Sequence, residues 1–238
     1  MSYLAKETCS LFGRAVHNYG LVRDGDQVAV GLSGGKDSLS LLWLLAERRR
    51  RVPIDFGLKA VWIDMGLPGF DGPALASFCR ALDVELIALR ADWDPAELGG
   101  CYPCARQRRK RLFQAAEEAG CGVVALGHNL DDAVETFFMN LIDHASASTI
   151  LPKQDFFSGR FQVIRPLILI SAAKLDRFAA ELALPVQPMD CPLAGQSSRA
   201  GFRGWLEPLY KKHPRARENI FRALTHFSDG SVPGPMEA

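Results

Sequence analysis

Short apolar segments alternate along this chain with longer segments of helical periodicity, and this alternation limits the fold more than any other feature. Alternating strand and helix signals predict βαβ units around a parallel sheet. Strands are expected at Val28–Leu32, Leu58–Ile63, Val84–Leu89, Val123–Leu126 and Phe161–Ile164. Helices are expected between them at Leu39–Arg50, Pro73–Leu82, Ala105–Ala119 and Asp131–Ile142. The sequence therefore predicts an α/β fold with a doubly wound parallel sheet.

One domain is expected to span residues 1–227, followed by a disordered tail at 228–238. It begins with a helical segment over about residues 1–25 and ends with a helical extension over about 171–227. Helices of the extension are predicted at Ala173–Leu182, Ser198–Lys211 and Pro214–His226. Of the 238 residues 48% are hydrophobic, so a chain of this size forms a core without needing disulfides.

A cytoplasmic location is expected, without a membrane partner. The longest apolar run, Leu39–Ala46, is far shorter than the roughly 18 residues that a membrane span requires. The N-terminal segment carries Lys6, Glu7 and Arg14, whereas a secretory signal needs an uninterrupted apolar stretch. In the cytoplasm the six cysteines stay reduced, so clustered ones indicate metal binding or catalysis.

A glycine-rich turn follows the first predicted strand. Its sequence is SGGKDS, residues Ser33, Gly34, Gly35, Lys36, Asp37 and Ser38. A strand, a glycine-rich turn and a helix start together present backbone N–H groups and a helix dipole to an anion. Lys36 adds a positive charge and the serines add hydroxyl donors. A carboxylate such as Asp37 beside phosphates indicates a bound Mg²⁺.

A CxxC pair, Cys101 and Cys104, is expected on a loop at the start of a helix. This spacing alone is compatible with redox, zinc or iron–sulfur chemistry. The best third cysteine is Cys191, in a loop beyond the sheet, and three thiols can ligate three irons of a [4Fe-4S] cluster while one iron stays open. The remaining thiols are interpreted as small buried hydrophobic groups: Cys9, Cys79 and Cys121.

Basic residues cluster although the net charge is only +1. The run Arg48–Arg51 is interpreted as a solvated helix end. The second run is expected on a helix, and it spans residues 106–111. Helical spacing places Arg106, Arg109 and Lys110 on one face, suited to RNA phosphates, while Arg108 points elsewhere.

A second polar motif, GHNLDDAVET, follows the fourth predicted strand at residues 127–136. Taken alone, Asp131 and Asp132 are explained by carboxylates at a helix N-terminus, which the helix dipole favours. The motif nevertheless follows a strand whose carboxyl end should face the same crevice as SGGKDS. A functional role is therefore also expected for it.

These motifs together carry a resemblance to a known family. SGGKDS resembles the PP-loop of the N-type ATP pyrophosphatases, which cleave ATP between its α- and β-phosphates. With CYPC, ARQRRKR, GHNLDDAVETFFMN and DCP in order over about residues 10–227, the chain resembles the tRNA 2-thiolation enzymes of the PP-loop superfamily. Within them it is most similar to the tRNA-cytidine 2-sulfurtransferases. It appears shorter than they are, and it lacks the N-terminal zinc module of the uridine group.

The resemblance implies specific roles. ATP would be bound by the SGGKDS residues together with Ile63 and Gly127, with the adenine near Gly31–Leu32 and Trp62–Ile63. The [4Fe-4S] cluster would be held by Cys101, Cys104 and Cys191. Asp132 would lie near the adenylated base and Arg108 near phosphate or base, so the expected catalytic residues are Asp37, Arg108 and Asp132. The implied partners are tRNA, a sulfur donor such as a cysteine desulfurase, and a second copy in a homodimer.

The resemblance also implies a reaction. The C2 oxygen of a pyrimidine, expected to be the cytidine at anticodon-loop position 32, attacks the α-phosphate of ATP, and sulfur then replaces the oxygen. Sulfur comes from the cluster or from a cysteine persulfide. Two further alternatives remain open. One is a PP-loop ligase of the lysidine-synthase or amidotransferase type; the other is a nucleotide-binding module with zinc on the three cysteines and His128.

Overall fold

The computed structural model describes residues 1–66, 68–93, 98–188 and 198–225. The chain divides into two compact units, and each is described here by itself. Unit 1 comprises Met1–Asn129 and Leu151–Ser197, and unit 2 comprises Leu130–Ile150 and Ser198–Ala238. The expected C-terminal extension is thus divided, because its first helix lies in unit 1. The GHNLDDAVET motif is divided too, after Asn129.

A six-stranded sheet forms the centre of unit 1, with the strand order β3-β2-β1-β4-β6-β5. The strands are β1 (Gln27–Leu32), β2 (Gly57–Asp64), β3 (Glu85–Arg90), β4 (Val123–Ala125), β5 (Lys153–Phe156) and β6 (Phe161–Ile164). All five predicted strands are confirmed. The sheet is not parallel throughout, however, because the unpredicted β5 pairs antiparallel with β6 as a hairpin at one edge.

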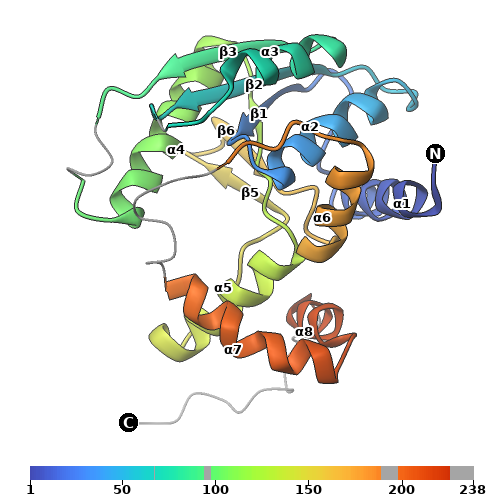
Figure 1. Cartoon of the computed structure of the whole chain (residues 1–238), viewed down its shortest axis with the longest axis vertical. Helices are drawn as coiled ribbons and strands as arrows, with labels where there is room; N and C mark the ends of the chain where they lie inside the picture. The colour runs from blue at the N-terminus through green and yellow to red at the C-terminus, as the bar shows by residue number, and fades with distance from the viewer. Residues whose placement is uncertain (67, 94–97, 189–197, 226–238) are drawn as a thin grey trace. The chain divides into compact units, whose positions relative to one another are not determined.

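Helices cover both faces of this sheet, as Figure 1 shows. Along β1, Val28, Val30 and Leu32 pack with one group of helices, while Ala29 packs into a second core with α4. The alternation follows from the two-residue period of a strand. The doubly wound architecture is confirmed. The helices of unit 1 are α1 (Tyr3–Asn18), α2 (Lys36–Arg49), α3 (Gly72–Ala81), α4 (Cys101–Glu118) and α6 (Ala172–Glu181).

The direction of the strand order reverses at β1. The chain runs outward from β1 through β2 to β3, and then α4 crosses to the other face and leads back to β4 beside β1. At such a switch point the loops after neighbouring strands leave in opposite directions and open a crevice at the carboxyl ends. SGGKDS follows β1 and Gly127 follows β4, so both lie at this crevice.

Unit 2 consists of α5 (Leu130–His144), α7 (Ser198–Lys212) and α8 (Ala216–Thr225). Its small core contains the buried side chains of Val134, Leu206 and Tyr210, with Phe138 and Ile220 packed against them. The predicted helices are confirmed with shifted ends. None of the helices in the described part of the chain is long and apolar enough to cross a bilayer.

Candidate active site

The turn between β1 and α2 requires glycine at Gly34. Its φ angle is +79°, in the left-handed region that favours glycine. A Cβ atom at this position would also lie 2.6 Å from a ring carbon of Phe70. The carbonyl of Gly34 accepts a 2.9 Å hydrogen bond from the backbone N–H of Gln187, which fixes the turn from outside.

Serine hydroxyls hold the same turn from inside. Ser38 Oγ accepts a 3.1 Å hydrogen bond from the Ser33 N–H and donates one of 2.9 Å to the Gly35 carbonyl. The hydroxyls of Ser33 and Ser38 lie 3.2 Å apart. Helix α2 begins after Gly35 without a side-chain cap, so its first N–H groups remain for an anion. The turn is therefore shaped for phosphate before any ligand arrives.

Two side chains hold the charged residues of the turn: Asp176, which the sequence analysis missed, and Asn129 of the GHNLDDAVET motif, which was expected at this crevice. Lys36 Nζ lies 3.1 Å from the Asp176 carboxylate of α6 and 3.8 Å from the Asp37 carboxylate. Asn129 Nδ2 donates a 3.4 Å hydrogen bond to Asp37 Oδ2. Asp176 and Asn129 come from segments distant in sequence, so only the fold identifies them as partners.

A cavity of about 230 Å³ opens where these residues meet. It brings together six residues that the sequence analysis assigned to binding or catalysis: Ser33, Asp37, Ser38, Ile63, Arg108 and Gly127. Gly31, Leu32, Val61 and His128 also line it. Trp62 does not, because its indole stacks on the Phe70 ring at 4.8 Å on the other face of the sheet. The cavity combines an apolar wall with hydroxyl, carboxylate and guanidinium groups.

Glycines allow two elements to approach the cavity closely. A Cβ atom on Gly127 would lie 3.1 Å from the Ser38 backbone nitrogen and 3.2 Å from the Asp37 carbonyl carbon. A Cβ atom on Gly31 would lie 2.9 Å from Leu112 Cδ2 of α4. A larger residue at Gly127 would separate the loop after β4 from the backbone at the start of α2, whereas one at Gly31 would require the Leu112 side chain to move.

The CxxC pair lies inside α4 and not on a loop before it. Cys101 and Cys104 occupy its first turn, and both are half-buried. The helix can include Pro103 there because first-turn N–H groups have no intrahelical acceptor. Arg108 follows Cys104 by four residues and therefore lies one turn further along the same side of α4. That side faces the 230 Å³ cavity.

The third predicted ligand, Cys191, lies outside the described residues. Among those that are described, no three histidine, cysteine, aspartate or glutamate side chains gather as a metal site. His128 lines the cavity beside Asp37. The described residues therefore supply two thiols, one helical turn apart.

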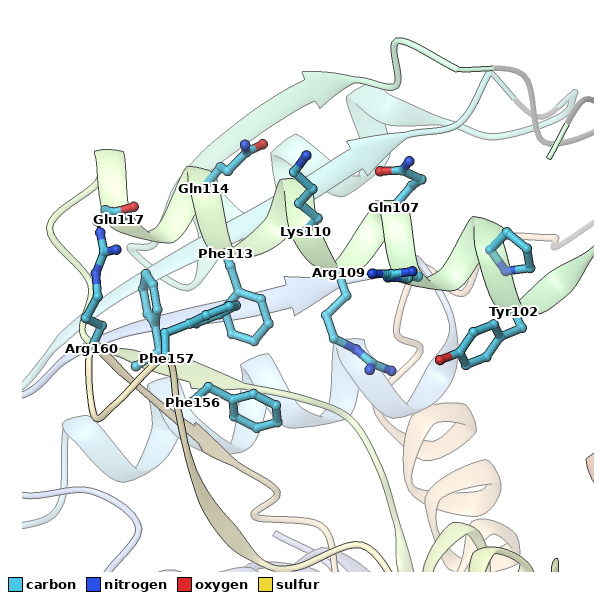
Figure 2. Close-up of a pocket in the computed structure, with 13 residues that line it drawn as sticks. Tyr102, Gln107, Arg109, Lys110, Phe113, Gln114, Glu117, Phe156, Phe157 and Arg160 are labelled. Carbon is cyan, nitrogen blue, oxygen red and sulfur yellow. Dashed lines mark hydrogen bonds and ion pairs between the residues drawn. The ribbon is translucent and has the colours of Figure 1, made fainter. Parts of the chain in front are cut away.

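The basic run on α4 separates as its spacing predicts. Arg108 lines the 230 Å³ cavity, whereas Arg106, Arg109 and Lys110 line a second cavity of about 740 Å³ beside the β5–β6 hairpin. Figure 2 shows the Arg109 side chain extending toward the hairpin and Lys110 pointing away from the aromatic rings. Arg108 and Arg109, adjacent in the sequence, thus line different cavities.

In unit 2, arginines that the sequence analysis missed pair with two carboxylates of α5. Arg217 Nε donates a 2.6 Å hydrogen bond to Asp131, and Arg203 donates bonds of 2.8 and 3.2 Å to Glu135. The bond to Glu135 raises the pKa of Arg203. Asp132, half-buried, lies beside Asp131 in the first turn of α5. Asp131 therefore has a structural role within unit 2.

Comparisons with known proteins identify the family of this chain. A model of the PP-loop domain matches residues 7–185. A tRNA-cytidine(32) 2-sulfurtransferase of Geobacter sulfurreducens is 37% identical over 229 residues, which are 92% of this chain and 89% of that protein. The chain belongs to the PP-loop family. A second tRNA-cytidine(32) 2-sulfurtransferase, from Alkalilimnicola ehrlichii, is 39% identical over 93% of this chain and 73% of that protein.

A solved tRNA thiolase has the same fold. It is the U34-tRNA thiolase NcsA of Methanococcus maripaludis with its [4Fe-4S] cluster, 28% identical with a TM-score of 0.75. The match covers 94% of this chain and 80% of that one. The resemblance to tRNA 2-thiolation enzymes that the motifs indicated is therefore confirmed.

Proposed function

We propose that this chain is an ATP-dependent tRNA 2-sulfurtransferase that acts on cytidine at position 32 of the anticodon loop. The relatives that match over most of their length carry that activity in their names. The observation that carries the proposal is the placement of α4. This one helix holds Cys101 and Cys104 in its first turn and directs Arg108 into the cavity beside the PP-loop residues Ser33, Asp37 and Ser38.

ATP binds at the turn between β1 and α2. The N–H groups of the turn and Lys36 bind its phosphates, and Asp37 would hold a Mg²⁺ ion that neutralises phosphate charge. The apolar wall of Gly31, Val61 and Ile63 suits the adenine. Lys36 Nζ lies 3.1 Å from Asp176 and 3.8 Å from Asp37, so these carboxylates keep its ammonium group beside the turn. Pre-positioned charges of this kind stabilise the negative charge that develops as pyrophosphate leaves.

The donor set on α4 fits an iron–sulfur cluster. Cys101 and Cys104 are reduced, half-buried thiols that present two soft sulfur ligands from one helical turn, which suits iron–sulfur ligation. We assign the third position to Cys191. A cluster on these residues would supply the sulfur that replaces the C2 oxygen. Arg108, one turn from Cys104, stabilises the negative charge on the adenylate phosphate.

RNA recognition uses the exposed basic residues of the same helix. Arg106, Arg109 and Lys110 bind phosphates of the anticodon stem-loop, since all three are exposed and line one groove. Asp132 acts near the adenylated base. The target must be an unstacked loop nucleotide, because its C2 oxygen is enclosed in a paired helix. A donor such as a cysteine desulfurase supplies the sulfur.

The decisive experiment follows tRNA nucleosides by mass spectrometry after incubation with ATP, Mg²⁺ and a sulfide source under anaerobic conditions. We expect 2-thiocytidine in a transcript with cytidine 32 and none in a matched transcript with uridine 32. Iron and sulfide analysis of the same preparation should give about four of each per chain and lose both in Cys191→Ala. Zinc without iron, or ATP turnover with no thiolated nucleoside, would contradict the proposal.

A further inference from the structure

The second cavity beside α4 has an aromatic floor, and we call it the aromatic groove. It encloses about 740 Å³ between α4 and the β5–β6 hairpin. Figure 2 shows the rings of Phe113, Phe156 and Phe157 gathered between the helix and the hairpin. The thirteen residues that line it are Tyr102, Pro103, Arg106, Gln107, Arg109, Lys110, Phe113, Gln114, Glu117, Phe156, Phe157, Arg160 and Phe161.

One ring of this floor is presented to solvent. Phe113 is buried and packs against Phe157 at 5.5 Å and against Phe161 at 5.3 Å between ring centroids. Phe157 stands edge-on to Phe113, at 86°, and remains 58% exposed. It is thus supported from below by a buried ring while much of its own surface stays open. A supported, exposed aromatic ring is a platform on which a planar group can stack.

Phe157 has a left-handed backbone conformation that is unfavourable for phenylalanine. Phe157 and Ser158 have φ angles of +52° and +57°, and the Phe156 carbonyl accepts a 3.2 Å hydrogen bond from Gly159. Hairpin turns with two left-handed central residues strongly prefer asparagine and glycine. A phenylalanine is strained there, so the turn geometry does not account for its presence. Strain of this kind is typically retained where the side chain has a function.

Positive charge surrounds the floor. Arg106, Arg109 and Lys110 line the groove and are exposed. The one carboxylate in the lining, Glu117, is paired with Arg160 across the end of the groove. An aromatic floor with a basic rim complements a single-stranded nucleic acid, whose bases stack and whose phosphates are anionic.

The groove also begins beside the cysteines. Tyr102 and Pro103, the two residues between Cys101 and Cys104, form one of its ends. The groove then follows α4 for about four turns toward Glu117, given 3.6 residues per turn. Phe113, the ring that supports Phe157, lies 12 residues beyond Cys101 on α4, an axial rise of about 18 Å. A base stacked on Phe157 would therefore lie within a few nucleotides of one that reacts near Cys101.

We propose that the aromatic groove binds an unpaired nucleotide of the anticodon loop close to the target, its base stacked on Phe157 and its phosphate bound by Arg109. This inference rests on the proposed function for the identity of the RNA. A second copy of the chain is a poorer occupant, because a symmetric pairing of two grooves would bring their arginines together.

The test uses Phe157→Asn in the full-length protein. Asparagine adopts the left-handed conformation readily, so the turn is kept while the ring is removed. We expect the KM for tRNA to rise by roughly 10-fold, a typical loss for one stacked base, with kcat unchanged. Phe157→Trp should restore the wild-type KM. Tyr3→Asn, which removes an 83% exposed ring on α1, is the matched control and should have no effect.

Equilibrium binding separates this inference from the proposed function. The affinity for an anticodon stem-loop with 5-bromouridine beside position 32 is measured by fluorescence anisotropy, and ultraviolet cross-links are mapped by mass spectrometry. We expect cross-links to residues 153–164 and weaker binding by Phe157→Asn, whether or not thiolation is detected. Unchanged affinity of Phe157→Asn would overturn the inference. The inference would also be overturned if the wild type sedimented as a dimer, Phe157→Asn sedimented as a monomer, and the RNA affinity of the variant were unchanged.

Discussion

The two sides of α4 face cavities that differ in size and in chemistry. The side with Cys104 and Arg108 faces a cavity of about 230 Å³ lined by hydroxyl and carboxylate groups. The side with Arg109 and Phe113 faces a groove of about 740 Å³ with an aromatic floor. Successive residues of a helix are about 100° apart, so Arg108 and Arg109 diverge. A basic run in a sequence is therefore not necessarily one surface, and its members can have separate tasks.

The largest effect is expected on the cysteine side. Cys104→Ala should lower the rate of thiolation by more than about 100-fold, since loss even of residues that only orient metal ligands costs 10–100-fold. Affinity for tRNA should stay within about 2-fold of wild type, because the groove residues are untouched. Nucleoside mass spectrometry and anisotropy provide the two readings. Cys121→Ala, which removes a buried thiol elsewhere, is the control.

Replacing Arg108 and Arg109 one at a time tests directly whether the two sides of α4 have different roles. Arg108→Gln should lower kcat by roughly 10-fold or more, because a guanidinium that meets developing charge acts mainly in the transition state. Arg109→Gln should instead raise the KM for tRNA and leave kcat near its wild-type value. Steady-state kinetics at varied tRNA concentrations distinguish them. If both variants changed the same parameter, α4 would have one functional side.

A smaller and purely electrostatic effect is expected at the rim of the groove. The double variant Arg109→Gln/Lys110→Gln should weaken tRNA binding and reduce the slope of log affinity against log salt by about two. Phe157→Asn weakens binding without changing this slope, since stacking releases no counterions. Titrations at several salt concentrations give the slopes. An unchanged slope in the double variant would remove both residues from the RNA interface.

The smallest effect on thiolation and on tRNA binding is expected at Cys79, a buried thiol outside α4. Burial raises its pKa to about 11 from an ordinary 9.0. The folded state therefore holds this proton more tightly than the unfolded state, and the resulting stability is complete below pH 9 and is lost as the pH rises through 11. Chemical denaturation should show a shallower loss for Cys79→Ala over this range. Equal slopes would contradict the assignment, although Cys9 and Cys121 keep part of the dependence.

The sequence predicted the elements with strong periodicity and missed those without it. The apolar strands β1 to β4 and β6 carry their own signal, whereas β5 reads KQDF, which is polar and has no alternation. It forms a strand because it pairs antiparallel with β6 in the hairpin, which is a tertiary contact. The start of α4 was also placed too late, because Gly100 and Pro103 indicate a turn and no capping side chain marks the helix.

The site was predictable where one segment supplies the chemistry. The residues of SGGKDS and Arg108 are defined by local spacing, and the structure places Ser33, Asp37, Ser38 and Arg108 at one cavity. Their supports were not predictable. Asp176 binds Lys36 from a distance of 140 residues in sequence, and in unit 2 the partner of Glu135 is Arg203. Such pairs depend on tertiary structure and leave no pattern within a short window.

The position of Arg108 on α4 has a consequence for the order of chemical events. A helix rises 1.5 Å per residue, so about 6 Å of axial rise separates Cys104 from Arg108, and a hydrogen-bonded helix does not stretch. The packing of Leu112 against Gly31 holds this rod against the sheet. If Cys104 and Arg108 have the roles proposed above, the spacing between the sulfur ligand and the phosphate-binding guanidinium is set by the helix and does not change during the reaction. The proposed chemistry then requires the nucleotide to be placed between two fixed points.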